Sequence, residues 1–453
     1  MCAGKQHRTE LHPIPGWRDL NSFIYLDPKF AASIGRVRTD VGSAAGQLSG
    51  YWLAIKDNID VVNMPTTCGT PSLRHNVVRR SASAVEMLCA AGASVVGKTN
   101  MHELAFGITS NNAAFGPVHN VFDIDSIAGG SSGGTAAAIA AGVVHAGLGT
   151  DTGGSARIPA ALNGIVGFRP TVGRYPMGGV ARICPTRDVI GPMGRTVHDI
   201  VLLDSVLCAH SDAEVQEADL CGLRIGLPGE HFQESLHPDV ARTLRDVVAR
   251  LRRAGVVFVE KDLKDIAALN AAVGFPVVLR ETRAALTAYL DDCGLDMTFA
   301  ELCAGAASAD VREILAQVAQ EVISEEAYRH ALREERPRIQ RLYEEYFASH
   351  CVEAVLFPTT PLPACPIDGC DRQVSLNGVR VPTFATYIRN TDPGSNAGIP
   401  GISLPAGFSL GPETDAKRLP IGVELDGPAG SDRRLLSIAA AVEGVLSQNP
   451  FNA

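Results

Sequence analysis

Small residues dominate the chain between Gly129 and Arg157, and this segment constrains the fold more than any other. Gly134 to Ala141 is rich in alanine and predicts a helix that is apolar on all sides. Such a helix must be buried, and its small side chains allow close packing. Val143 to Leu148 predicts a strand directly after it. We therefore expect this segment near the centre of the fold.

The same alternation of helix and strand occurs earlier in the chain. Leu53 to Ile55 predicts a short buried strand, Ala82 to Ala91 a helix that ends at Gly92, and Ser94 to Gly97 the next strand. Such alternation favours a layered α/β fold with parallel strand pairs. Strands that return to the same sheet are predicted late in the chain, at Ala354–Pro358, Ile402–Leu404 and Ile421–Leu425.

These elements predict one large α/β domain over residues 1–453, with a central mixed β-sheet covered by helices on both faces. Its core occupies about residues 50–207, and residues 351–453 return strands to the sheet. Residues 262–350 are charged and predict a divergent helical insertion laid over the sheet, with a break at Gly274 to Pro276.

Composition excludes several classes of function. Hydrophobic residues make up 46% of the chain and charged residues 20%, which is typical of a globular protein with a large core. The net charge of −9 argues against a nucleic-acid partner. The 11 cysteines show no metal-binding spacing and indicate a reducing compartment. We expect a cytoplasmic protein with no metal, no cofactor and no membrane partner.

Two serines lie in glycine-rich loops at either end of this small-residue segment. Ser131 lies in Gly129–Gly134, and Ser155 follows Gly153 and Gly154. Glycines allow backbone N–H groups to approach a ligand closely. A serine becomes a nucleophile when a base removes its proton, and Lys56, which directly follows an apolar strand, is one candidate. The pattern indicates acyl transfer.

The first serine loop has two other interpretations. It lacks the Gly-Lys-Ser/Thr ending of a phosphate-binding loop. Gly129 to Gly133 matches the GxSxG nucleophile elbow, which requires a strong apolar strand before it and a late histidine. Asp123 to Ala128 is a poor central strand, and His330 and His350 lie in charged helical surroundings. The elbow remains an alternative.

The loop around Ser155 follows a predicted strand, Ala146 to Gly149. Ligands bind at such strand ends in open α/β sheets. Successive backbone N–H groups of this loop are expected to form an oxyanion hole, from Thr152, Gly153, Gly154 and Ser155. Asp151 and Arg157 are expected to form an ion pair that supports the loop.

Together with further motifs, these segments resemble the amidase signature family of serine hydrolases. The motifs lie between about Leu20 and Leu207 and resume at Asn396; they are Leu53–Asn58, Gly97–Glu103, the two serine loops, Gly167–Thr171, Asp188–Met193, Asn396–Pro405 and Pro420–Leu425. The chain departs from the family pattern at Gly50 to Leu53 and in a shortened N-terminal hairpin.

The resemblance implies a catalytic triad of Lys56, Ser131 and Ser155. In it Ser155 attacks the carbonyl and forms an acyl-enzyme, and Ser131 relays the proton to a neutral Lys56. A cis peptide between Gly130 and Ser131 is also implied. The positions assigned to substrate binding are Met101, Thr109, Gly129 and Gly130.

The segments Thr109–Asn112, Gly167–Pro176 and Pro185–Asp188 look most like the indoleacetamide and mandelamide hydrolase branch. This likeness implies hydrolysis of a small, aryl-substituted primary amide to a carboxylate and ammonia. A ureide or malonamide hydrolase is an alternative, in which Arg182 or Arg389 would bind an acidic substrate. Further alternatives are the A-type subunit of a tRNA-dependent amidotransferase complex and a non-catalytic scaffold. A homodimer is also left open.

Overall fold

The computed structural model describes residues 11–31, 46–209, 215–410 and 418–447. The N-terminal region expected to be shortened falls partly in residues 1–10 and 32–45, outside this part of the chain. Within it, an 11-stranded sheet runs in the order β1 (Phe23–Leu26), β3 (Ser94–Thr99), β2 (Trp52–Lys56), β6 (Ala146–Asp151), β8 (Val189–Gly194), β7 (Val166–Arg169), β14 (Gly401–Phe408), β15 (Pro420–Asp426), β11 (Ala354–Pro358), β9 (Arg224–Gly226) and β10 (Val257–Val259).

The sheet is mixed, as the sequence predicts. Strand β2 pairs in parallel with both β3 and β6. From β6 to β11 the neighbouring strands are antiparallel, and β11, β9 and β10 are parallel again. Two small hairpins lie outside the sheet, formed by β4 (Asn111–Asn112) with β5 (Gly116–Pro117) and by β12 (Gln373–Leu376) with β13 (Val379–Pro382).

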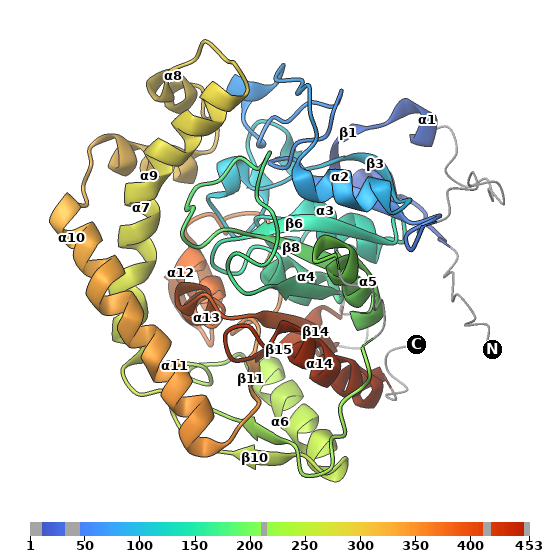
Figure 1. Cartoon of the computed structure of the whole chain (residues 1–453), viewed down its shortest axis with the longest axis vertical. Helices are drawn as coiled ribbons and strands as arrows, with labels where there is room; N and C mark the ends of the chain where they lie inside the picture. The colour runs from blue at the N-terminus through green and yellow to red at the C-terminus, as the bar shows by residue number, and fades with distance from the viewer. Residues whose placement is uncertain (1–10, 32–45, 210–214, 411–417, 448–453) are drawn as a thin grey trace.

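Helices cover both faces of the sheet (Figure 1). One face packs against α2 (Ser83–Ala90), α5 (Val197–Leu207), α6 (Pro238–Arg253) and α14 (Asp432–Ser447). The other packs against α3 (Gly133–Ala140) and α4 (Arg157–Asn163). Residues alternate between the faces along a strand, so Leu53 and Ile55 join the first core while Ala54 packs with α3.

A second group of helices forms an arc beside the sheet (Figure 1), from α7 (Ile266–Asp292), α8 (Phe299–Ala304), α9 (Ala309–Ala319) and α10 (Glu325–His330) to α11 (Arg336–His350). Five π-helical residues, Ala331–Glu335, connect α10 to α11. This arc forms a core of its own that includes Val355 and Phe357 of β11. The remaining short helices are α1 (Pro28–Ala31), α12 (Thr383–Ile388), α13 (Asp392–Ala397) and the 3₁₀ turns Trp17–Leu20, Pro71–Leu73 and Glu103–Ala105.

The expected helix break at Gly274 to Pro276 is wrong. Helix α7 continues through Pro276 to Asp292. Proline removes one backbone donor, but Val273 and Val277 on either side are fully buried in the core of the arc. Burial of this face therefore holds the helix together across the proline.

The strand predicted at Val143 to Leu148 also differs from the structure. The N–H of Val143 donates to the carbonyl of Ala138 at 3.0 Å, so Val143 closes the end of α3 rather than begins a strand. The strand, β6, runs from Ala146 to Asp151. Thr150 and Asp151 consequently belong to the sheet, and the loop that carries Ser155 begins at Thr152.

In the described parts of the chain, no helix combines the length and apolar character needed to cross a membrane.

Candidate active site

Lys56 is the last residue of β2 and is fully buried. It lies two positions after Ala54, so its side chain points to the face that packs against α3. Its Nζ donates to Ser131 Oγ at 2.7 Å and to Thr150 Oγ1 at 2.8 Å. Burial lowers the pKa of Lys56 to about 7, against the opposing effect of the Asp151 and Asp188 carboxylates. Lys56 can therefore carry or release a proton near neutral pH.

Ser131 lies two residues before α3 and is also fully buried. The Gly130–Ser131 peptide is cis, as the resemblance implies. The carbonyl of Ser131 accepts a hydrogen bond from the N–H of His102 at 3.2 Å. The chain therefore fixes the backbone of Ser131 while its hydroxyl contacts Lys56.

Ser155 lies in the loop between β6 and α4, on the wall of a cavity, and is 8% exposed. Its carbonyl accepts a hydrogen bond from the N–H of Ser132 at 3.1 Å, which ties the two serine loops together. Among the described residues, no hydrogen bond joins the hydroxyls of Ser131 and Ser155. The structure thus brings the three predicted residues to one place but pairs only Lys56 with Ser131.

The backbone donors expected to form an oxyanion hole are not equivalent. The N–H of Gly154 donates to Asp151 Oδ1 at 2.9 Å, so this donor is already engaged, which corrects the expectation from the sequence. The N–H groups of Thr152, Gly153 and Ser155 have no acceptor within the described chain. They are the donors left to bind a developing oxyanion.

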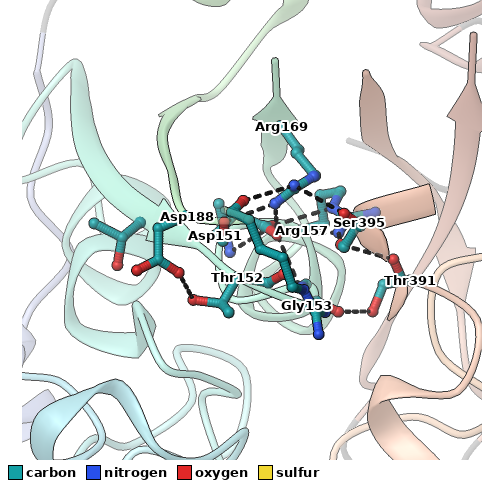
Figure 2. A network of polar contacts seen from close by, with 12 residues as sticks. Asp151, Thr152, Gly153, Arg157, Arg169, Asp188, Thr391 and Ser395 are labelled. Atoms are coloured by element: carbon teal, nitrogen blue, oxygen red, sulfur yellow. Dashed lines mark hydrogen bonds and ion pairs between the residues drawn. The ribbon is translucent and has the colours of Figure 1, made fainter. Parts of the chain in front are cut away.

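A buried network of charged groups supports the loop (Figure 2). As predicted, Asp151 and Arg157 form an ion pair, with Nη2 and Oδ1 3.0 Å apart. Arg157 also pairs with Glu424, and Arg169 Nη1 donates to the Asp151 carbonyl at 2.7 Å. Burial opposes ionisation of Asp151, but the two arginines hold its pKa well below its usual range. The network therefore keeps its charges in a dry interior.

Two hydroxyl groups fix the loop from outside this network. Thr152 Oγ1 donates to Asp188 Oδ1 at 2.6 Å, and Thr391 Oγ1 donates to the carbonyl of Gly153 at 2.6 Å (Figure 2). Asp188 also accepts hydrogen bonds from the N–H groups of Ile183 and Cys184. The side chain of Thr152 and the carbonyl of Gly153 are thereby held by side chains from distant segments.

The cavity beside Ser155 has a volume of about 410 Å³. This volume falls within the range of ~300–1,000 Å³ that is usual for small-molecule sites. Its walls are mostly apolar and come from the 105–108 loop, α7, α9 and α12; the large apolar residues are Phe106, Ile108, Ile183, Phe275, Val278, Ile314, Phe384 and Ile388. Its ionisable residues other than the serine are Arg187, His231, Arg389 and Asp392.

The residues assigned to substrate binding from the sequence are not among the residues that line this cavity. Met101 is fully buried in the core of the arc. Thr109 Oγ1 contacts His102 Nδ1 at 3.3 Å. Gly129 and Gly130 pack against α4 and the 108–110 segment, where a side chain would not fit. The two glycines directly precede Ser131, and this close packing fixes the approach of the chain to it.

Sequence reasoning missed several residues of the site. Thr150, the second partner of Lys56, was placed in a turn because the strand was predicted to end too early. The cavity walls from α7 and α9 lie in a region whose sequence carries no recognisable motif. Among the missed residues, those that belong to a motif, such as Asp188, could have been identified from the sequence. The others carried no such signal.

Comparison with known proteins identifies the family to which the chain belongs. The amidase family model matches residues 19–436. An indoleacetamide hydrolase of Agrobacterium vitis is 44% identical over 90% of this chain and 86% of its own length. A mandelamide hydrolase of Pseudomonas putida is 41% identical over 97% and 87%, respectively. A crystal structure of an amidase superposes with a TM-score of 0.79 at 31% identity, covering 95% of this chain and 93% of the other. The chain therefore belongs to the amidase family, whose members hydrolyse amide C–N bonds.

Proposed function

We propose that this amidase hydrolyses small, aryl-substituted primary amides through an acyl-enzyme on Ser155. The observation that carries the proposal is the position of Ser155 on the wall of an apolar cavity, beside a buried Lys56–Ser131 pair. A lysine with a pKa of about 7 is a suitable general base near neutral pH. In this proposal Ser131, whose hydroxyl contacts Lys56 Nζ, passes the proton from Ser155 to Lys56.

In the proposed reaction, Ser155 Oγ attacks the amide carbonyl while its proton moves through Ser131 to Lys56. The N–H groups of Gly153 and Ser155 bind the resulting oxyanion. The C–N bond then breaks, and the departing nitrogen takes the proton from Lys56 through Ser131 to leave as ammonia. Water attacks the acyl-enzyme in the same way, giving the carboxylate and restoring the Ser155 hydroxyl.

The aryl group of the substrate is inferred from the cavity walls and from the relatives. Phe106, Phe275 and Phe384 line the cavity and offer ring faces and edges to an aromatic ligand. Relatives that share more than two fifths of the sequence are named indoleacetamide hydrolase and mandelamide hydrolase. Both observations favour an arylacetamide or a related amide.

One observation favours a second candidate, a hydrolase of malonamide or ureide type. Of the two arginines considered for an acidic substrate, Arg389 lines the cavity and Arg182 does not. An amidotransferase subunit is distinguished from both by its need for partner subunits. Activity of the purified chain alone would exclude that assignment.

The experiment is an ammonia-release assay with indoleacetamide, phenylacetamide, mandelamide, malonamide and biuret, on wild type and the Ser155→Ala variant. We expect the highest kcat/KM for an aryl amide and no turnover by Ser155→Ala. A fluorophosphonate should label Ser155; labelling of Ser131 instead would support the nucleophile elbow. Preference for malonamide or biuret would replace the aryl proposal. The cytoplasmic location and the homodimer stay predictions, which cell fractionation and sedimentation velocity test.

A further inference from the structure

Two arginines line the catalytic cavity, and they differ in how their charge is compensated. Arg187 forms an ion pair with Asp392. It also donates to the carbonyl groups of Gly274 and Thr152, at 3.1 Å each. Burial opposes the charge on Arg187, but Asp392 raises its pKa. The guanidinium of Arg187 is therefore already bound to groups of the protein.

Arg389 has no such partners. Its Nε donates to Asn390 Oδ1 at 3.1 Å, and its Nη2 is buried without an acceptor. Within the described residues, no carboxylate forms an ion pair with it. Burial lowers the pKa of Arg389, and Glu234 opposes this effect without reaching ion-pair distance. Arg389 is therefore a partly buried cation that no carboxylate of the described chain neutralises by an ion pair.

The charge balance of the cavity also indicates that the charge of Arg389 is not compensated. Asp392 is the carboxylate among the cavity residues, and it is neutralised by Arg187 and hydrogen-bonded by Asn270 Nδ2 at 3.0 Å. Burial lowers the pKa of His231, which favours its neutral form. The ionisable residues of the wall then leave one positive charge, that of Arg389.

The backbone around Arg389 is fixed, which suits a binding residue. Its carbonyl contacts His231 Nε2 at 2.9 Å. Asn390 next to it donates to the carbonyls of Phe232 at 3.0 Å and Pro358 at 2.7 Å. The Asn390 side chain fixed in this way accepts from Arg389 Nε, which reduces the conformational freedom that the guanidinium loses when it binds an anion.

From these contacts we propose that Arg389 binds a carboxylate on the aryl part of the substrate, so that acidic aryl amides are the preferred substrate class. Leaving a buried cation unpaired is unfavourable, and a carboxylate with its two oxygens matches the planar guanidinium. The apolar walls take the aryl group, and the amide lies at Ser155. The inference rests on the proposed aryl amidase function.

The test compares phenylacetamide with its 3-carboxy and 4-carboxy derivatives on wild type, Arg389→Met and Arg389→Lys. For wild type we expect the better carboxylated amide to have a higher kcat/KM than phenylacetamide. Arg389→Met should lower the kcat/KM of the better carboxylated amide, divided by that of phenylacetamide, by roughly 10- to 100-fold. The change should arise mainly in KM, because a charge-assisted hydrogen bond to the carboxylate is lost. Arg389→Lys keeps the charge and should retain part of the preference. Arg182→Met is the matched control and should leave the ratio unchanged.

Binding without turnover gives a second readout. Calorimetry on Ser155→Ala should show that the carboxylated amide binds more tightly than phenylacetamide, and that adding Arg389→Met removes the difference. A wild-type preference for phenylacetamide, or a ratio that Arg389→Met does not change, overturns the role of Arg389 while leaving the amidase proposal intact. Absence of turnover of all three aryl amides would instead overturn the proposed function on which the inference rests.

Discussion

Asp188 accepts a hydrogen bond of 2.6 Å from the hydroxyl of Thr152, and the same carboxylate raises the pKa of Lys56. One buried acid therefore acts on both halves of the proposed machinery. Through Thr152 it fixes the loop that carries Ser155, and through its charge it partly offsets the effect of burial on the lysine. This double role makes the pH dependence of the enzyme a direct probe of the site.

The first prediction concerns the pH profile of the wild-type enzyme. Neutral Lys56 is the proposed base, so kcat/KM for an aryl amide should rise with pH and level off above a pKa of about 7. Stopped assays of ammonia release between pH 5 and 9 measure this. A profile that is flat across this range would exclude a lysine with the lowered pKa as the base.

The second prediction concerns Asp188→Asn. Removing this carboxylate takes away an influence that raises the pKa of Lys56, so the acidic limb of kcat/KM should move to lower pH. Asparagine can keep its oxygen as acceptor for the N–H groups of Ile183 and Cys184 and donate its NH2 to Thr152 Oγ1. The control is Glu86→Gln, an exposed acid paired with Arg80, which should leave the limb in place. An unchanged limb in Asp188→Asn would contradict the electrostatic role.

The third prediction links Lys56 to stability. Because the pKa of Lys56 is lowered on folding, the unfolded chain binds more protons between pH 7 and 10, and the wild type gains stability as pH rises. Lys56→Met lacks this gain. The difference in unfolding free energy, Lys56→Met minus wild type, should fall by about 1.4 kcal/mol per pH unit in this window. Urea unfolding at several pH values measures it, and parallel curves would contradict it.

The fourth prediction concerns Arg157→Met. Arg157 is fully buried between Asp151 and Glu424, so its removal leaves Glu424 without its cationic partner and Asp151 with Arg169 alone. This loss should cost about 3–5 kcal/mol. Arg434→Met removes an exposed pair with Glu353 and should cost less than ~1 kcal/mol. Denaturant unfolding of both variants provides the comparison. Similar losses in the two proteins would show that the buried network does not stabilise the fold.

The fifth prediction concerns the loop before Ser155. Gly154 has a φ of +139°, and a Cβ there would overlap with Thr391. Gly154→Ala should therefore lose more than about 1 kcal/mol of stability together with most of its activity. Gly173→Ala is a matched control, because Gly173 has a φ of +85° but open space around it. If the two variants behave alike, backbone conformation alone explains the effect and the contact with Thr391 is unimportant.

The sequence predicts the central elements of the fold well where its pattern is local. Ala354–Pro358 is a strand with the predicted bounds, and the mixed sheet with helices on both faces is confirmed. Prediction failed where distant contacts decide the outcome. Pro276 stays inside a helix because of the core on which it packs, and Thr150 joins β6 because β8 pairs with it.

The same distinction between local pattern and distant contacts applies to the candidate site. Lys56, Ser131 and Ser155 could be predicted from motifs, and the structure places them together. The cavity walls could not be predicted, because Phe275 and Ile314 come from helices with no motif, and their position depends on how the arc packs beside the sheet. Which polar groups are already engaged, such as the Gly154 N–H or Arg187, also requires three-dimensional contacts.

The arrangement of the cavity has a consequence for how such an enzyme can change. Lys56, Ser131 and Ser155 lie on the sheet and its adjoining loops, whereas much of the cavity wall comes from α7, α9 and α12. In the proposed mechanism, bond-breaking and ligand choice are thereby encoded in separate stretches of the chain. Exchange of α7 and α9 between related amidases would be a route to new substrates that leaves the reacting groups unaltered.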